Sequence, residues 1–289
     1  MQRTDTADII CGPFIIETVD AMFYRFILCL SLVLCAPTVS AQFVFSAPPR
    51  EDAAEAERFY TPLAKELSRI IGDKVVFDAP ESWAAYSRNI QEGNYDFVLD
   101  GPHFVAWRIA HTGHVPLVRL DGHLDYTLFT HQDGPASLDA LRFEKVCSMA
   151  SPNLAAVVLL AQFSPYHAPT LVAPRGGVKG SFEAFLDARC SAVILPSYFL
   201  EKLPPEKTAG LRPVFTSNKL ANLTLTAGPR VDPRVHADLV AALGQAHTLP
   251  TLKPLLQKLA GNGTGIFLPA TSSDYAGNEK LLEGVVWGW

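Results

Sequence analysis

The stretch "YDFVLDGPHF", Tyr95 to Phe104, runs from apolar residues into a carboxylate and then into Gly-Pro. A continuous apolar run is typical of a strand buried on both faces, as in a parallel sheet covered by helices. Proline stops the strand and suits the start of the next element. Asp100 is then expected at the carboxyl end of a buried strand, where open α/β sheets bind ligands. A carboxylate before Gly-Pro also makes an ordinary turn cap, and this alternative stays open.

The same pattern recurs along the chain. Apolar runs that lead to a small or polar residue and a proline occur in "FVFSAPPR", "VVFDAPES", "TLVAPRGG" and "AVILPSYF". Apolar spacing over 59–71 and 83–90 indicates helices between the first of these runs, and Ser82 is the expected cap of the second helix. This order predicts an α/β protein with mostly parallel sheets flanked by helices. Candidate ligand residues follow the strand ends: Ser46, Asp78, Asp100, Arg175 and Ser197.

Two α/β sets predict two lobes. We expect residues 42–127 and 222–289 to form the first lobe and residues 128–221 the second. The stretch "HLDYTLFTHQ" is the expected crossing into the second lobe, and "NLTLTAGPRV" is the expected returning strand. Two crossings make a hinge, and a cleft between hinged lobes suits a small ligand.

Residues 22–41 have the pattern of a secretory signal peptide. One basic residue, Arg25, precedes the apolar run 26–36, and Val39, Ser40 and Ala41 are small. We expect cleavage after Ala41 and treat residues 1–41 as a leader, in which 1–21 reflect a translation start assigned too early.

An exported chain would keep two cysteines, Cys147 and Cys190. In an oxidising compartment they form one disulfide or remain two buried thiols, and the sequence leaves both alternatives open. The formal net charge of −5 and the lack of a basic block argue against a nucleic-acid partner.

The chain resembles the phosphate/phosphite/phosphonate-binding proteins of bacterial ABC importers, which have the type II periplasmic binding protein fold. Four segments carry the resemblance: "FYTPLAKELSRIIGDKVVF", "WAAYSRNIQEGNYDFVLDGPHFVAW", "SLDALRFEKVCSMASPN" and "GIFLPATSSDYAGNEKLL". The resemblance implies a periplasmic protein, expected to be monomeric, that closes on a small polar or anionic ligand and passes it to an ABC permease. It implies neither catalysis nor a cofactor.

The resemblance also implies a set of ligand residues. The family holds its oxyanion at a helix start in the second lobe, where this chain has Ser151 and Asn153. Lys179 and Ser181 lie near polar ligand contacts of the family, and Tyr86 matches a family tyrosine. With the strand-end residues and the neighbouring His103, the candidate ligand set is Ser46, Tyr86, Asp100, His103, Ser151, Asn153, Arg175, Lys179, Ser181 and Ser197.

Two other functions remain open. Five of the eight histidines crowd into the segment 103–131, and imidazole with carboxylate suits transition metals. No HExxH motif or paired cysteine spacing accompanies them, and no nucleophile elbow or phosphate loop indicates an enzyme. A periplasmic sensor or adaptor that acts with a membrane histidine kinase is the other alternative.

Overall fold

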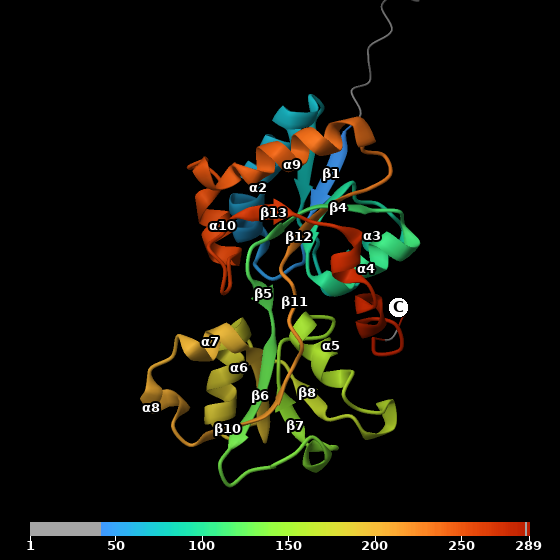
Figure 1. The fold of residues 1–289 in the computed structure, drawn as a ribbon. Coiled ribbons are helices and arrows are strands. Elements are labelled where there is room, and N and C mark those ends of the chain that lie inside the picture. The colour runs from blue at the N-terminus through green and yellow to red at the C-terminus, as the bar shows by residue number, and fades with distance from the viewer. Residues whose placement is uncertain (1–41, 287) are drawn as a thin grey trace, which may run out of the picture. The chain divides into compact units, whose positions relative to one another are not determined.

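The structure is a computed structural model that describes residues 42–286 and 288–289. The expected leader, residues 1–41 with its signal peptide at 22–41, lies outside the described residues. From Gln42 onward the chain forms two lobes, each a sheet with helices packed against it (Figure 1).

The first lobe is built on a six-stranded sheet with the order β13-β4-β12-β3-β1-β2. Strands β1, β2 and β3 pair in parallel, whereas β12 runs antiparallel to β3 and β4, and β13 runs antiparallel to β4. The strands are β1 (Phe43–Ser46), β2 (Val75–Asp78), β3 (Phe97–Asp100), β4 (Val115–Leu120), β12 (Thr224–Ala227) and β13 (Phe267–Pro269). The carboxyl ends of β1 and β3 therefore lie side by side.

Helices cover both faces of this sheet. On one face a large apolar cluster joins the sheet to α2 (Ala53–Ile71), α9 (His236–Gly244) and α10 (Lys253–Leu259). On the other face, α3 (Trp83–Gln91) and α4 (Pro102–His111) pack through an aromatic cluster around Tyr86 and Phe104.

The second lobe is built on a five-stranded sheet with the order β10-β6-β9-β7-β8. Strands β7, β8 and β9 are parallel, and β6 runs antiparallel to β9 and β10. The strands are β6 (Tyr126–His131), β7 (Lys145–Cys147), β8 (Thr170–Val172), β9 (Ala192–Pro196) and β10 (Leu211–Thr216); the helices are α5 (Leu154–Leu160), α6 (Gly177–Leu186), α7 (Ser197–Glu201) and α8 (Pro205–Thr208). Helix α5 packs on one face, whereas α6 and α7 pack on the other.

Two segments cross between the lobes and pair as the short strands β5 (His123–Leu124) and β11 (Leu220–Ala221). The predicted crossing "HLDYTLFTHQ" contains β5 and continues into β6. The predicted returning strand "NLTLTAGPRV" follows β11 and contains β12. Because β6 begins at Tyr126, the second sheet starts two residues before the expected boundary at residue 128.

Caps explain where the helices begin and end. Ser82 caps α3 by accepting a hydrogen bond from the Ala85 amide, and Gly72 ends α2 with φ of 78° in the left-handed region. Helix α2 begins at Ala53, earlier than the apolar spacing from Phe59 predicts, because Asp52 accepts the Glu55 amide and caps a polar first turn.

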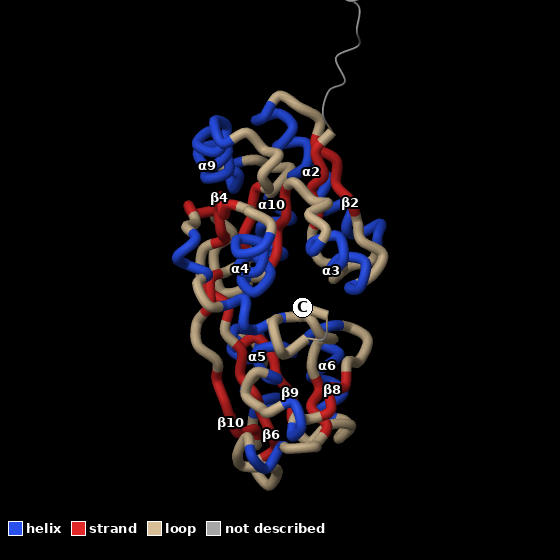
Figure 2. Tube along the Cα trace, turned by 90° about the vertical axis from the view of Figure 1, so that its right-hand side faces the viewer, coloured by secondary structure: helices blue, strands red, loops and turns tan. Residues whose placement is uncertain are grey.

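The C-terminal segment packs against both lobes. Leu281 and Val285 contact the apolar cluster of α5, whereas Leu282 and Trp289 contact the cluster of α3 and α4. Figure 2 shows the C-terminus between these helices. The described residues also form six short 3-10 turns: Asp139–Leu141, Pro165–His167, Pro233–Val235, Ala246–Thr248, Ser272–Tyr275 and Asn278–Leu281.

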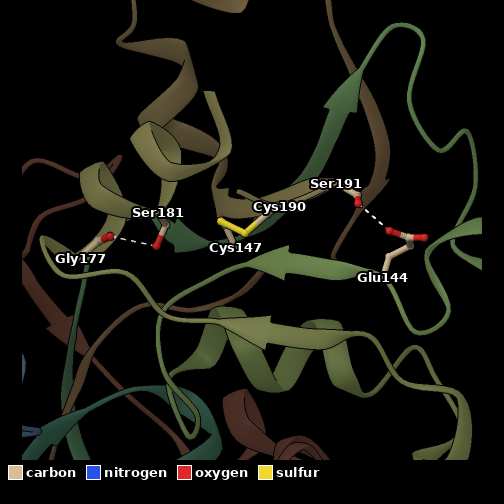
Figure 3. The surroundings of a disulfide bond; sticks show 6 residues. All are labelled: Glu144, Cys147, Gly177, Ser181, Cys190 and Ser191. Atoms are coloured by element: carbon tan, nitrogen blue, oxygen red, sulfur yellow. Dashed lines mark hydrogen bonds between the residues drawn. A yellow bond between two sulfur atoms is a disulfide. The ribbon is translucent and has the colours of Figure 1, made fainter. Parts of the chain in front are cut away.

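A disulfide joins Cys147, the last residue of β7, to Cys190, which precedes β9 (Figure 3). The two Cα atoms are 5.6 Å apart, and 43 residues separate the cysteines in sequence. Nearby, Ser191 donates a hydrogen bond to Glu144 at 2.6 Å and Ser181 donates to the Gly177 carbonyl at 3.0 Å. The bridge therefore closes a long loop that contains α5, β8 and α6.

We expect the double variant Cys147→Ala/Cys190→Ala to lose about 3–4 kcal/mol of unfolding free energy, because the unfolded chain regains the entropy of this loop. Urea unfolding followed by circular dichroism measures the difference. As a control, a reducing agent should lower the wild-type midpoint and leave the midpoint of the double variant unchanged. Equal midpoints for wild type and variant would contradict the prediction.

Candidate functional site

A cavity of about 220 Å³ lies between the two lobes, at the carboxyl ends of strands from both sheets. Arg50 and Glu51 enter it from the segment after β1, and His103 enters from the start of α4. The second lobe contributes Asn153 before α5 and Tyr198 after β9. The other lining residues are Trp83, Gly101, Phe104, Leu124, Tyr126, Met149, Leu154, Ala155, Val178, Pro196, Asn222, Leu223, Lys258, Leu259 and Gly261.

Arg50 is the central charge of this cavity. The positive charge of its guanidinium acts to lower the pKa values of tyrosines and a histidine from both lobes. These residues are Tyr60, Tyr86, His103, Tyr126 and Tyr198. Burial raises the pKa of Tyr60 to about 12, and the nearby Arg50 opposes this shift. Arg50 has no ion-pair partner among the residues that the structure describes. An unpaired, half-buried guanidinium favours an anionic ligand.

Glu51 and Lys258 form a charged pair at the edge of the cavity. The Lys258 ammonium lies 3.5 Å from Glu51 Oε1 and 2.8 Å from Glu55 Oε1. The other oxygen of Glu51, Oε2, is buried and has no hydrogen-bond partner. The positive charge of Lys258 cancels the negative charge of Glu51. The charge of Arg50 therefore makes the cavity lining positive overall.

His103 links the two lobes. Its Nε2 lies 3.0 Å from the carbonyl oxygen of Pro152, in the segment that leads to α5. Burial lowers the pKa of His103 to about 4, although the Asp100 carboxylate and the Pro152 carbonyl act in the opposite direction. The ring is therefore neutral near pH 7, and its Nδ1 is buried without a partner.

Asp100 was expected to be an open ligand acceptor at the end of β3, but its carboxylate is bonded inside the first lobe. Its carboxylate is fully buried and accepts two hydrogen bonds from Arg108, at 2.6 and 2.8 Å. Tyr86 donates a third hydrogen bond at 2.6 Å, so this candidate is also engaged inside the first lobe. Burial, followed by the charge of Asp100, raises the pKa of Tyr86 well above its ordinary value. The side chain is neither an open acceptor nor a simple turn cap, because Arg108 satisfies it.

Most other candidates bond within their own lobe. Ser46 donates to the Asp78 carbonyl, Ser181 donates to the Gly177 carbonyl, and Ser197 bonds with Thr127. The position of Ser46 at a strand end was therefore not enough to bring it into the cavity lining.

The remaining candidates divide between surface and cavity. Ser151 and Arg175 are exposed, and Lys179 is exposed beside Glu183 at 3.6 Å. Asn153 lines the cavity, where its side chain also accepts the Ala155 amide and caps α5. The structure thus brings two of the ten candidates, His103 and Asn153, into the cavity lining.

The sequence reasoning missed Arg50, although "FVFSAPPR" contains the signal. A cation shortly after the end of a buried strand is the same feature that marked Arg175. Trp83, Tyr126, Tyr198 and Lys258 carried no comparable signal, because only the packing of the lobes brings them to the cavity.

The histidines of segment 103–131 do not gather. Across residues 42–286 and 288–289, no three His, Cys, Asp or Glu side chains stand close enough to hold a metal ion. His103 and His114 are buried at different places, whereas His111 stacks on Trp107 and His131 stacks on Phe185. Within the same residues, no helix combines the length and the apolar character that a membrane span requires.

Two α/β lobes with a paired crossover and a cavity between them define a two-lobed periplasmic binding protein. This is the fold that the sequence predicts. The chain matches the structure of PhnD1 from Prochlorococcus marinus in complex with methylphosphonate, with 13% identity, a TM-score of 0.63 and coverage of 83% of this chain and 97% of that one. Residues 45–275 match the family of periplasmic substrate-binding proteins of phosphonate ABC transporters, and the chain belongs to this family. The resemblance inferred from the four sequence segments is thereby confirmed.

Two further structures share the fold. A protein from Xanthomonas citri, solved bound to ATP, has 17% identity and a TM-score of 0.65, with 85% of this chain and 97% of that chain covered. A binding protein component of an ABC phosphonate transporter from Pseudomonas aeruginosa has 13% identity and a TM-score of 0.59, with 84% and 85% covered. A comparison with curated proteins finds no match.

The chain is therefore the substrate-binding component of an ABC importer, which implies a small-molecule ligand, a permease partner and a periplasmic location. The sensor and metal-binding alternatives have no support from these comparisons.

We expect Asp100→Asn to destabilise the fold by about 3–5 kcal/mol, because it leaves the buried Arg108 guanidinium without its counter-charge. Urea unfolding measures the loss. Asp139→Asn is the matched control, since Asp139 is 81% exposed and its pair with Arg142 contributes little. An unchanged stability with a weakened ligand affinity would restore Asp100 as a ligand residue.

His114 should make the fold sensitive to acid. Burial, with a smaller contribution from the Arg108 charge, lowers its pKa to about 3, and Thr226 and the Tyr95 carbonyl are its polar partners. Between about pH 6.5 and pH 3 the unfolded chain binds a proton that the folded chain does not. Stability is therefore present above pH 6.5 and is lost as the pH falls.

Urea unfolding at pH 7 and pH 4 tests this expectation. His114→Gln should lose less stability between the two pH values than wild type, and the exposed His247→Gln should behave like wild type. The same loss in all three proteins would show that His114 does not contribute.

Proposed function

We propose that the ligand is a small organophosphonate or a similar oxyanion, held between the lobes with Arg50 as its counter-charge. The single observation that carries this proposal is the half-buried Arg50, whose guanidinium has no ion-pair partner among the described residues and whose charge affects side chains of both lobes. Family membership and the methylphosphonate in the structure of PhnD1 support the same ligand class.

The rest of the lining suits an organic substituent rather than a second charge. Trp83, Phe104, Tyr126 and Tyr198 supply aromatic surface, and Leu124, Val178 and Leu223 supply aliphatic surface. Asn153 and Asn222 offer amide groups for oxygen atoms. A tetrahedral anion with an apolar group therefore matches the cavity better than inorganic phosphate.

Ligand binding is coupled to lobe closure in this proposal. The two lobes move as two bodies about β5 and β11. Arg50 and Tyr198, on opposite lobes, then meet the same ligand only when the cleft closes, which is how such proteins gain affinity on closure. We further propose that the chain is exported with the signal peptide 22–41, that it acts as a monomer and that it carries out no catalysis.

We expect Arg50→Gln to weaken methylphosphonate binding at least tenfold, about 1.4 kcal/mol, because the anion loses its only unpaired cation in the described lining. Isothermal titration calorimetry measures the dissociation constant. Arg175→Gln is the matched control, since Arg175 is exposed outside the cavity. A loss of affinity in Arg175→Gln instead of Arg50→Gln would move the anion site to the second lobe.

A further inference from the structure

The hydrogen bond of His103 determines which ring nitrogen carries the proton. Nε2 lies 3.0 Å from the carbonyl oxygen of Pro152, and a carbonyl can only accept. Nε2 must therefore be the protonated nitrogen of the neutral ring. Nδ1 is left with a lone pair, as an acceptor of hydrogen bonds.

This acceptor has no partner inside the protein. His103 is 2% exposed, its Nδ1 is buried without a hydrogen bond, and the residue lines the cavity between the lobes. A buried polar atom that stays unsatisfied costs about 1–3 kcal/mol, so a ligand that donates to it removes this cost on binding.

The charges around His103 keep the ring neutral. Asp100 at the end of β3 favours a proton on the ring, but Arg108 on α4 satisfies that carboxylate. Arg50, in the segment after β1, and Arg108 both oppose a second positive charge, and burial opposes it most. Pro152 contributes only its carbonyl from the second lobe.

We propose that His103 Nδ1 accepts a hydrogen bond from a protonated oxygen of the bound oxyanion, so that the site selects the monoprotonated anion. This inference rests on the proposed function, in which Arg50 holds the negative charge of the same ligand. A phosphonate monoanion carries one P–OH group and one negative charge, and it satisfies both residues. A sulfonate has the same tetrahedral shape and charge but no proton to donate.

Glu51 Oε2 is another acceptor of the described lining without a hydrogen-bond partner, and the His103 variants separate its contribution from that of His103. Glu51 lies 3.5 Å from Lys258 through its second oxygen, and this cation compensates the carboxylate. His103 offers an uncharged acceptor in the same lining as Arg50, and it suits a ligand that is both anionic and protonated.

Titration calorimetry with methylphosphonate and methanesulfonate tests the proposal. At pH 6, wild type should bind methylphosphonate at least tenfold more tightly than methanesulfonate. His103→Leu should bring this ratio close to one, and His103→Gln, which keeps a side-chain acceptor, should retain part of it. His111→Leu, on the exposed side of the same helix, should keep the wild-type ratio.

A second measurement on wild type needs no variant. Raising the pH from 6 to 9 should weaken methylphosphonate binding, because the P–OH group ionises, and should leave methanesulfonate binding unchanged. Equal affinity for the two anions, or a phosphonate affinity that does not fall with pH, would overturn the role of His103 and leave the role of Arg50 standing. Binding of neither anion would contradict the proposed function and overturn this inference with it.

Discussion

The buried ion pair of Asp100 and Arg108 organises the first lobe at the edge of the cavity. Asp100 ends β3, Arg108 lies on α4, and the pair is completed by Tyr86 from α3 and by Thr226 from β12, at 3.1 Å from the guanidinium. Burial alone would lower the pKa of Arg108, but the charge and hydrogen bonds of Asp100, together with Tyr86, raise it above its ordinary value. Since both charges are almost inaccessible to water, neither tolerates loss of the other.

This pair also determines where the cavity residues stand. It holds α4 against the sheet, and the first turn of α4 carries His103 towards the second lobe. Gly101 must be small there, because a Cβ atom would approach the His103 ring to 2.9 Å. The buried Asp100–Arg108 pair lies outside the cavity lining but thus positions the His103 ring, which is part of that lining.

The cavity combines one free cation of the described lining with a neutral acceptor and aromatic surface. Lys258 is occupied by Glu51 and Glu55, so its charge does not compete with Arg50. Two kinds of contact span the lobes: the hydrogen bond from His103 to Pro152 and the packing of the C-terminal segment. A larger hollow of about 650 Å³ lies beside that segment, and Lys280 is the one charged residue of its described lining. No carboxyl end of a parallel strand lines this hollow among the described residues.

The sequence by itself determined the local elements, the class and the family. Apolar runs, prolines, the Ser82 cap and Gly72 are local signals, and they predicted β1, β3, α3 and the end of α2 because their causes lie within a few neighbouring residues. The same signals could show that Asp100 ends a strand but not what faces it. Arg108, which pairs with it, lies on α4, and Thr226, which accepts a hydrogen bond from Arg108, lies on a strand over a hundred residues away. Tertiary structure alone decided that Asp100 has an ion-pair partner, that Arg50 has none among the described residues, and that His103 Nδ1 in the cavity lining has no hydrogen-bond partner. The physical reason is that a charge or a lone pair is defined by its partners, and those partners come together only when the two sheets have folded.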